Sequence, residues 1–256
     1  EQLSLVDAVI EVIDARIPLS SRYNNISGLL NSKPRFLLIN KCDLVDKTEL
    51  DKFIEFLSKD TGITVIPTTA KNSKDLNIIV KEAIRLSEPR IQALMAKGLL
   101  RRPARIMVVG LPNVGKSSII NKLTRSSKTK IGAKAGVTRQ QQWVRINPRL
   151  DLLDTPGIIP MRQDNQEVAM KLAFVNSVSE NAYSNEIVAN ELLKLLAEKY
   201  PEQLREYYKL EDEISLEKIA LSRNWIISGG QPDIERTSIY VLRDFREGKI
   251  GKFILD

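Results

Sequence analysis

The chain has 256 residues, which fits one large domain or a domain with a smaller partner, and no apolar run approaches the roughly 18 residues of a membrane span. Hydrophobic residues make up 43% and charged residues 28%, as in globular proteins, and the single Cys42 excludes an internal disulfide framework and favours a reducing, cytoplasmic compartment. The net charge of +7 is unevenly distributed: residues 1–174 hold 28 basic and 17 acidic side chains (+11), and residues 175–256 hold 11 and 15 (−4). The basic part indicates a polyanionic partner such as RNA. The alternative is a protein that is basic but has no such partner.

Short apolar stretches alternate with helical patterns through the first half of the chain. Strands are predicted at residues 7–14, 34–40, 64–67 and 105–110, and helices at 46–59 and 75–86. This alternation predicts an α/β domain with a mainly parallel sheet. Residues 142–146 and 150–154 flank a short turn and predict a hairpin, which adds one antiparallel strand at the edge of the sheet.

Long helical patterns follow residue 165, at 185–200, at 202–210 and in a segment that begins near Asp233. We therefore predict an α/β domain of residues 1–165 and a small all-α domain of residues 166–256. Residues 87–104 hold two prolines, one glycine and a basic cluster, and they are predicted to link two halves of the first domain.

The segment 110–117, Gly-Leu-Pro-Asn-Val-Gly-Lys-Ser, matches the phosphate-loop pattern between an apolar strand and a helix start. Gly110 and Gly115 allow successive N–H groups to point at phosphate oxygens, and the helix N-terminus adds partial positive charge. Lys116 is expected to reach the β- and γ-phosphates, and Ser117 to place its hydroxyl on Mg²⁺. An ordinary strand-to-helix turn is the alternative, which the surrounding pattern disfavours. Further nucleotide contacts are predicted at Asn113, Val114 and Ser118.

A second apolar strand ends in Asp154 and is followed by Thr155-Pro156-Gly157. Phosphate-loop enzymes need a carboxylate at this place to meet Mg²⁺, and Gly157 leaves its N–H free to approach a γ-phosphate. Thr138, in the segment between the two motifs, is predicted to supply the second hydroxyl to Mg²⁺. Lys116, Thr138 and Gly157 are the predicted catalytic groups.

The segment around Thr138 is basic, with no acid from residue 122 to 150. It is either a solvated, mobile loop or a surface that meets RNA phosphates and is ordered by them, and we favour the second. Its cations are Arg125, Lys128, Lys130, Lys134, Arg139, Arg145 and Arg149.

Two loops that follow consecutive strands indicate guanine recognition. Asp43 of Asn40-Lys41-Cys42-Asp43 would accept hydrogen bonds from guanine N1–H and N2–H₂, while Asn40 holds the base and Lys41 lies along the purine plane. The alternative is a polar strand end with a helix-capping Asp43. The companion loop 68–71 contains Thr69, Ala70 and Lys71, and the N–H of Ala70 would face guanine O6.

The base-reading loops precede the phosphate loops in this chain. A closed α/β domain tolerates that order if its original ends are joined by a new linker, for which residues 87–104 are the candidate. The sequence therefore predicts a circularly permuted guanine-nucleotide domain.

These motifs resemble those of the circularly permuted GTPases of the YlqF/RbgA type, the ribosome biogenesis GTPase A family. The resemblance covers nearly the whole chain and rests on DARIPLSSR (14–22), NKCD, TTAK, GLPNVGKSS, GVTRQQQW and DTPGI. It implies a GTPase that acts late in assembly of the large ribosomal subunit, with contacts to rRNA and ribosomal proteins. The motifs themselves predict GTP or GDP and Mg²⁺ as ligands, and we expect a monomer without membrane attachment. No function follows from DARIP itself, whose Asp14 and Arg16 could simply order a loop.

Three features bear on catalysis. Ile158 follows DTPG where Ras-like enzymes carry a water-orienting Gln, and an apolar side chain cannot orient a nucleophile. Family members carry a histidine in an N-terminal segment; this sequence has no His and opens without Met, so we expect further residues before it. Asn113 matches a position that helps to hold K⁺ in related GTPases, although it could equally brace the switch loop.

We therefore predict a GTPase with low intrinsic turnover that ribosomal particles stimulate. A nucleotide-dependent RNA-binding scaffold with little hydrolysis is the second possibility, because no water-activating side chain is visible. An ATPase of RNA metabolism is the third, and it requires both base loops to be coincidental.

Overall fold

The structure is a computed structural model, and it describes residues 2–23, 26–31, 33–69, 75–125, 129–130, 143–154, 157–158, 165–178 and 183–256. The contacts between residues divide the chain into two compact units. Unit 1 comprises Glu1–Asp43 and Lys47–Met161, and unit 2 comprises Leu44–Asp46 and Arg162–Asp256.

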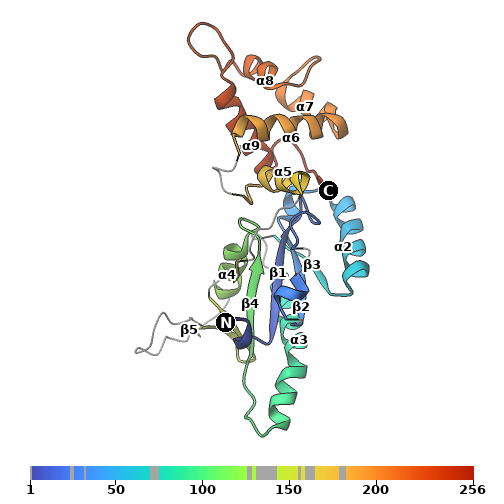
Figure 1. Ribbon diagram of the computed structural model, residues 1–256, viewed down its shortest axis with the longest axis vertical. Helices are drawn as coiled ribbons and strands as arrows, with labels where there is room; N and C mark the ends of the chain where they lie inside the picture. Colours follow the sequence, from blue (N-terminus) through green and yellow to red (C-terminus); the bar gives the residue numbers. More distant parts are fainter. Residues whose placement is uncertain are drawn as a thin grey trace. The chain divides into compact units, whose positions relative to one another are not determined.

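Unit 1 is built on one mixed sheet (Figure 1). Its strands are β1 (Ala8–Asp14), β2 (Arg35–Asn40), β3 (Val65–Pro67), β4 (Ala104–Gly110), β5 (Thr129–Lys130), β6 (Trp143–Asn147), β7 (Leu150–Leu153) and β8 (Gly157–Ile158). They lie in the order β3-β2-β1-β4-β7-β6-β5, with β8 paired to β4. The pairs from β3 to β7 are parallel, whereas β6 and β5 form an antiparallel edge. The predicted α/β class with its antiparallel hairpin is confirmed, and β5 extends that edge by one further strand.

The central strands are buried on both faces. All seven residues of β1 are buried, as expected for a parallel strand with helices on each side. The helices are α1 (Ile26–Leu29), α2 (Lys47–Thr61), α3 (Leu76–Ala96) and α4 (Lys116–Arg125), with single 3₁₀ turns η1 (Gln2–Leu5) and η2 (Cys42–Leu44). Figure 1 shows α2 and α4 on opposite sides of the sheet, while α3 contacts β1, β2, β4 and β7.

Helix α3 is longer than the sequence predicted. It was expected to end at residue 86, but it continues through Pro89 to Ala96, so residues 87–96 are not a linker. The reason is its buried face, which repeats every four residues and keeps the helix on the sheet despite the missing N–H of the proline. The segment between α3 and β4 is therefore only residues 97–103. The buried face consists of Ile79, Ala83, Ser87 and Ile91.

Unit 2 is helical in its described residues. Its helices are α5 (Gln166–Phe174), α6 (Asn185–Lys199), α7 (Pro201–Tyr208), α8 (Leu216–Ser222) and α9 (Ile234–Arg246). Helix α6 contacts α5, α7 and α9, and α8 also contacts α9. Three of these helices match the prediction, whereas α5 and α8 were not predicted. Within the described part of the chain, no helix combines the length and apolar character needed to cross a membrane.

Candidate nucleotide-binding site

The carboxyl ends of four parallel strands bring the predicted motifs to one edge of the sheet. Asp14 at the end of β1 lies opposite Asn40 at the end of β2, and Pro67 at the end of β3 lies opposite Ile39. Strand β4 runs parallel to β1 and ends at Gly110, where the phosphate loop begins. In open α/β sheets this edge is where ligands bind.

The phosphate loop has two places where a side chain cannot fit. A Cβ on Gly110 would lie 2.6 Å from the carbonyl oxygen of Val12, which belongs to the neighbouring strand and cannot move aside. Gly115 has φ +101°, and a Cβ on it would lie 2.1 Å from Nδ2 of Asn40. The close approach of β1 and β2 to the loop therefore requires both glycines.

Lys116 is the first residue of α4 and is 8% exposed. Its Nζ donates a hydrogen bond of 2.5 Å to the carbonyl oxygen of Leu111, across the loop. Burial lowers the pKa of the Lys116 ammonium. Ser117 and Ser118, on the first turn of α4, are exposed.

The loop after β2 contacts the phosphate loop directly. Nδ2 of Asn40 donates to the carbonyl oxygen of Val114 at 2.9 Å, and Nζ of Lys41 donates to the carbonyl oxygen of Asn113 at 2.8 Å. Oδ1 of Asn40 is buried and has no hydrogen-bond partner among the described residues. Two segments more than 70 residues apart in the chain thus form one surface.

The two predicted base-reading loops are also joined. Oγ1 of Thr69 donates to Oδ1 of Asp43 at 3.0 Å, and the backbone N–H of Cys42 donates to the carbonyl oxygen of Thr68 at 3.3 Å. Burial raises the pKa of the Cys42 thiol to about 12, so it is a neutral packing group at physiological pH. Ala70 and Lys71 lie outside the described residues.

Lys122 supports this arrangement and was missed by the sequence analysis. Its Nζ donates to the carbonyl oxygen of Thr69 at 2.9 Å, to Oγ1 of Thr68 at 3.1 Å and to Oδ1 of Asp75 at 2.6 Å. Helix α4, which begins at the phosphate loop, is thereby tied to the loop after β3. No motif marks Lys122; its only signal is a lysine next to the apolar face of an amphipathic helix.

The predicted magnesium ligands follow neighbouring strands. Asp154 comes directly after β7 and is exposed, and Ser117 follows β4, the strand that pairs with β7. Gly157 in β8 pairs with Val109, next to the start of the phosphate loop. An exposed hydroxyl and an exposed carboxylate are oxygen donors of the kind that Mg²⁺ prefers, so these residues fit the ion. Thr138 lies outside the described residues, within which no cluster of three or more His, Cys, Asp or Glu could hold a metal.

The basic segment is only partly described. Arg145 in β6 lies opposite Asp151 in β7 and forms a salt bridge with it, so this cation stabilises the hairpin. Arg149 lies 3.9 Å from Glu88, and Arg125 is exposed at the end of α4. The remaining predicted side chains, Lys128, Lys130, Lys134 and Arg139, are not described.

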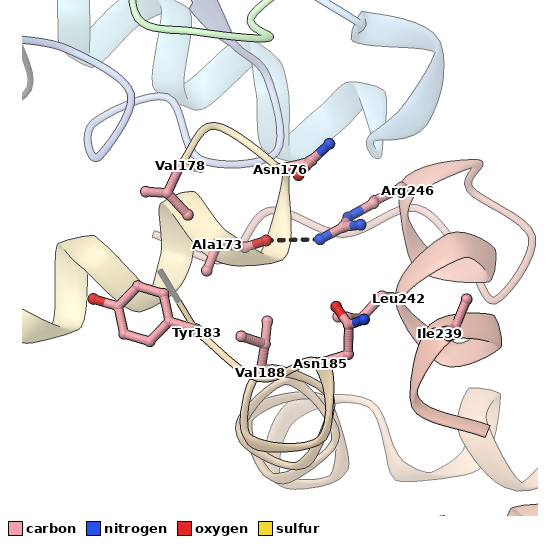
Figure 2. A pocket seen from close by; sticks show the side chains of 9 residues that line it. All are labelled: Ala173, Asn176, Val178, Tyr183, Asn185, Val188, Ile239, Leu242 and Arg246. Atoms are coloured by element: carbon pink, nitrogen blue, oxygen red, sulfur yellow. Dashed lines mark hydrogen bonds between the residues drawn. The ribbon is translucent and has the colours of Figure 1, made fainter. Parts of the chain in front are cut away.

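Unit 2 contains a separate pocket of about 250 Å³ between α5, α6 and α9 (Figure 2). Nη2 and Nε of Arg246 donate to the carbonyl oxygens of Ala173 and Phe174 at 2.9 Å each, which closes one side of it. Asn176 and Asn185 also line it, together with apolar side chains that include Val178, Val188 and Leu242. None of the residues predicted from the motifs lines this pocket.

Comparisons with known proteins show what the whole chain is similar to. The family described as "50S ribosome-binding GTPase" matches residues 105–221. Two relatives named "Ribosome biogenesis GTPase A" are similar along the entire chain: that of Bacillus cereus is 36% identical with 88% of its own length covered, and that of Priestia megaterium is 37% identical with 91% covered. The GNP-bound crystal structure of YlqF from T. maritima superposes with a TM-score of 0.71 at 27% identity, covering 100% of this chain and 94% of that one. A GDP-bound structure of the same protein gives a TM-score of 0.72.

Proposed function

The chain belongs to the YlqF/RbgA family of ribosome biogenesis GTPases, and on that premise we propose that it binds GTP and GDP at the edge of its sheet and acts in assembly of the large ribosomal subunit. The observation that carries the nucleotide site is the pair of hydrogen bonds from Asn40 and Lys41 to the phosphate loop. These bonds join the loop of residues 40–43 to the loop of residues 110–117, and this contact supports the proposal because two accidental motif matches would not be expected to meet.

Each motif has a role in the proposed reaction. The Asp43 carboxylate accepts hydrogen bonds from guanine N1–H and N2–H₂, and the hydrogen bond that it accepts from Oγ1 of Thr69 orients it for this contact. Lys116 stabilises the negative charge that develops on the transferred phosphoryl group. Bound Mg²⁺ would neutralise phosphate charge, with Ser117, Thr138 and Asp154 as its predicted holders.

Intrinsic hydrolysis is proposed to be slow. Ile158 stands where a water-orienting side chain would be needed, so the attacking water is not positioned by that residue. We propose that a large-subunit precursor, through its rRNA and proteins, orders the switch segment that contains Thr138 and so stimulates turnover. Asn113 is proposed to help hold K⁺ beside the phosphates, which would supply part of the charge that an arginine finger supplies elsewhere.

The base preference tests the nucleotide assignment. Asp43→Asn should weaken GTP binding by about tenfold or more and improve binding of xanthosine triphosphate. The amide oxygen can still accept from N1–H, but the amide NH₂ donates, so it suits the C2 oxygen of xanthine and not the N2–H₂ of guanine. A competition titration of the wild type and the variant against GTP, ATP and xanthosine triphosphate measures this. Equal affinity of the wild type for GTP and ATP would instead support an ATPase.

Turnover tests the assembly role. The GTP hydrolysis rate should rise when purified large-subunit precursors are added, and should be higher in potassium than in sodium. An unchanged rate with precursors that demonstrably bind the chain would favour the alternative of a nucleotide-dependent RNA-binding scaffold, which the apolar Ile158 also allows.

A further inference from the structure

The motif Asp14-Ala15-Arg16-Ile17-Pro18 has no part in the proposed reaction, yet its first residue lies at the nucleotide edge of the sheet. Asp14 ends β1, between the strands that carry the base loop and the phosphate loop. It is 0% exposed. A carboxylate that is fully removed from water needs charged or hydrogen-bonding partners, so its surroundings are informative.

Two cations hold the Asp14 carboxylate. Nε and Nη2 of Arg16 donate to Oδ1 and Oδ2 at 2.9 and 2.7 Å, in a two-point fork. The backbone N–H of Arg16 donates to Oδ1 at 3.1 Å, and Nζ of Lys41 donates to Oδ2 at 2.7 Å. Burial alone would raise the pKa of Asp14, but Arg16 and Lys41 together lower it to about 2, so the group is ionised.

Lys41 makes a second contact from the same nitrogen. Its Nζ also donates to the carbonyl oxygen of Asn113 in the phosphate loop at 2.8 Å, and its side chain is 23% exposed. A lysine side chain has several rotatable bonds and loses conformational entropy when it is fixed. The Asp14 carboxylate, itself fixed by Arg16, restrains the ammonium where it bridges the base loop and the phosphate loop.

We propose that Asp14 is a positioning residue for nucleotide binding: held by Arg16, it fixes Lys41 against the phosphate loop so that the base loop and the phosphate loop meet the nucleotide as one preformed surface. Preformation raises affinity because less ordering remains to be done on binding. The proposal rests on the proposed guanine-nucleotide binding and adds to it a role for the DARIP motif.

Asp7 provides a matched control at the opposite end of β1. It is 1% exposed, Arg102 donates to both of its oxygens at 2.7 and 2.8 Å, and Arg90 lies 3.2 Å away as a second cation. The backbone N–H of Arg105 completes the set at 2.8 Å. Asp7 therefore has the same chemistry as Asp14 but lies at the end of the strand away from the nucleotide edge.

The test compares Asp14→Asn with Asp7→Asn in the full chain, with GDP and Mg²⁺ as the probe in calorimetric titrations. Asp14→Asn should raise the Kd for GDP about tenfold or more, because a charge-assisted hydrogen bond to Lys41 is replaced by a neutral one. Asp7→Asn should stay within about twofold of the wild type while lowering the unfolding temperature. Equal effects of the two variants on the Kd would mean that Asp14 supports only the fold, and would overturn the proposal.

A double-mutant cycle tests whether Asp14 acts through Lys41. In a Lys41→Met background, adding Asp14→Asn should change the Kd for GDP by less than about twofold, because the group that Asp14 positions is already gone. A full, additive loss in that background would contradict the proposal. If Asp14→Asn does not fold, Arg16→Gln is the second variant, because it keeps the Asp14 carboxylate and removes only the paired hydrogen bonds from the Arg16 guanidinium. It should raise the Kd for GDP about fivefold. An unchanged Kd would overturn the proposal.

The titration of the wild type distinguishes failure of the proposed nucleotide binding from failure of the positioning role of Asp14. Absence of GDP binding by the wild type would remove the proposed function itself. Tight binding by the wild type together with tight binding by Asp14→Asn would leave that function intact and remove only the positioning role.

Discussion

At the scale of single residues, the nucleotide edge depends on charged groups that the fold buries in pairs. Asp14 is surrounded by Arg16 and Lys41, and Lys122 by Asp75 and two threonine oxygens. Removing one partner from such a group leaves an uncompensated charge or donor, which costs more than the pair contributes. These residues therefore couple the stability of unit 1 to the geometry of its loops.

The pH dependence of unfolding should report the Asp14 pair. Its pKa in the folded chain is about 2, below the roughly 3.9 of an unfolded aspartate, so folding favours the ionised form. The group thus contributes stability above about pH 4, on the order of 2–3 kcal/mol, which is lost as the pH falls towards 2. The difference in unfolding free energy between the wild type and Asp14→Asn should shrink by about 1 kcal/mol between about pH 6 and pH 3.

Amide hydrogen exchange in β1 and β4 at several pH values would measure that difference for unit 1 alone, since a chain with two units need not unfold in one step. Asp7→Asn serves again as the comparison, because it removes a buried, doubly paired carboxylate directly before the same strand. A difference between wild type and Asp14→Asn that stays constant with pH would show that the charge of Asp14 does not contribute as described.

The positions of site residues were predictable from the sequence only where a motif fixes them locally. Asn40 and Lys41 stand at the end of β2, and Lys116 follows the loop after β4, so their convergence was expected from the parallel strands. The contacts of Asp14 with Lys41 and of Lys122 with Thr69 join residues 27 and 53 positions apart. No local pattern encodes such a pair, because it depends on how the strands align.

At the scale of elements, strands were predicted better than helix ends. Runs of apolar residues bounded by polar residues marked β1, β2, β3 and β4 within about one residue. The signal is clear in β1, β2 and β4 because these strands are almost wholly buried. Helices α5 and α8 were missed, since nine and seven residues give too few turns for a clear period. Their N-caps, Asn165 and Ser215, were the available signals.

Pro89 should weaken α3. It lies inside the helix and is exposed, so its ring removes a hydrogen bond to the carbonyl of Arg85 without contributing to the buried face. Pro89→Ala should raise the unfolding free energy of unit 1 by about 1–2 kcal/mol, since the gain in helix propensity exceeds the loss of chain stiffness in the unfolded state.

Lys81→Ala, at another exposed position of α3, is the matched control and should change the unfolding free energy by less than about 0.5 kcal/mol. Hydrogen exchange in β1 and β4 again provides the measurement. A destabilised Pro89→Ala would mean that the proline, by bending α3, improves its fit to the sheet.

At the scale of the whole molecule, the order of the motifs does not matter to the site. The base loops come first in this chain, but the carboxyl ends of β2, β3 and β4 lie at the same edge of the sheet. The connection that allows this order runs through α3, which lies against the sheet, and not through a free linker. The permutation was therefore predictable from the motifs, whereas its structural form required the packing of α3.

The uneven charge of the chain predicts that its binding to large-subunit precursors depends on salt. Residues 1–174, which hold the nucleotide site, carry 28 basic and 17 acidic side chains. If these cations contact rRNA phosphates, the affinity of the chain for purified large-subunit precursors should fall by about tenfold or more between about 50 and 200 mM KCl at fixed Mg²⁺, because phosphate contacts release counterions. Co-sedimentation with the chain loaded with a non-hydrolysable GTP analogue measures this affinity.

Arg125→Gln, at the end of α4, should reduce the slope of log affinity against log salt by about one. Lys59→Gln, in which the lost charge is already paired with Glu55, should leave the slope unchanged, and equal slopes for both variants would place the rRNA contact elsewhere.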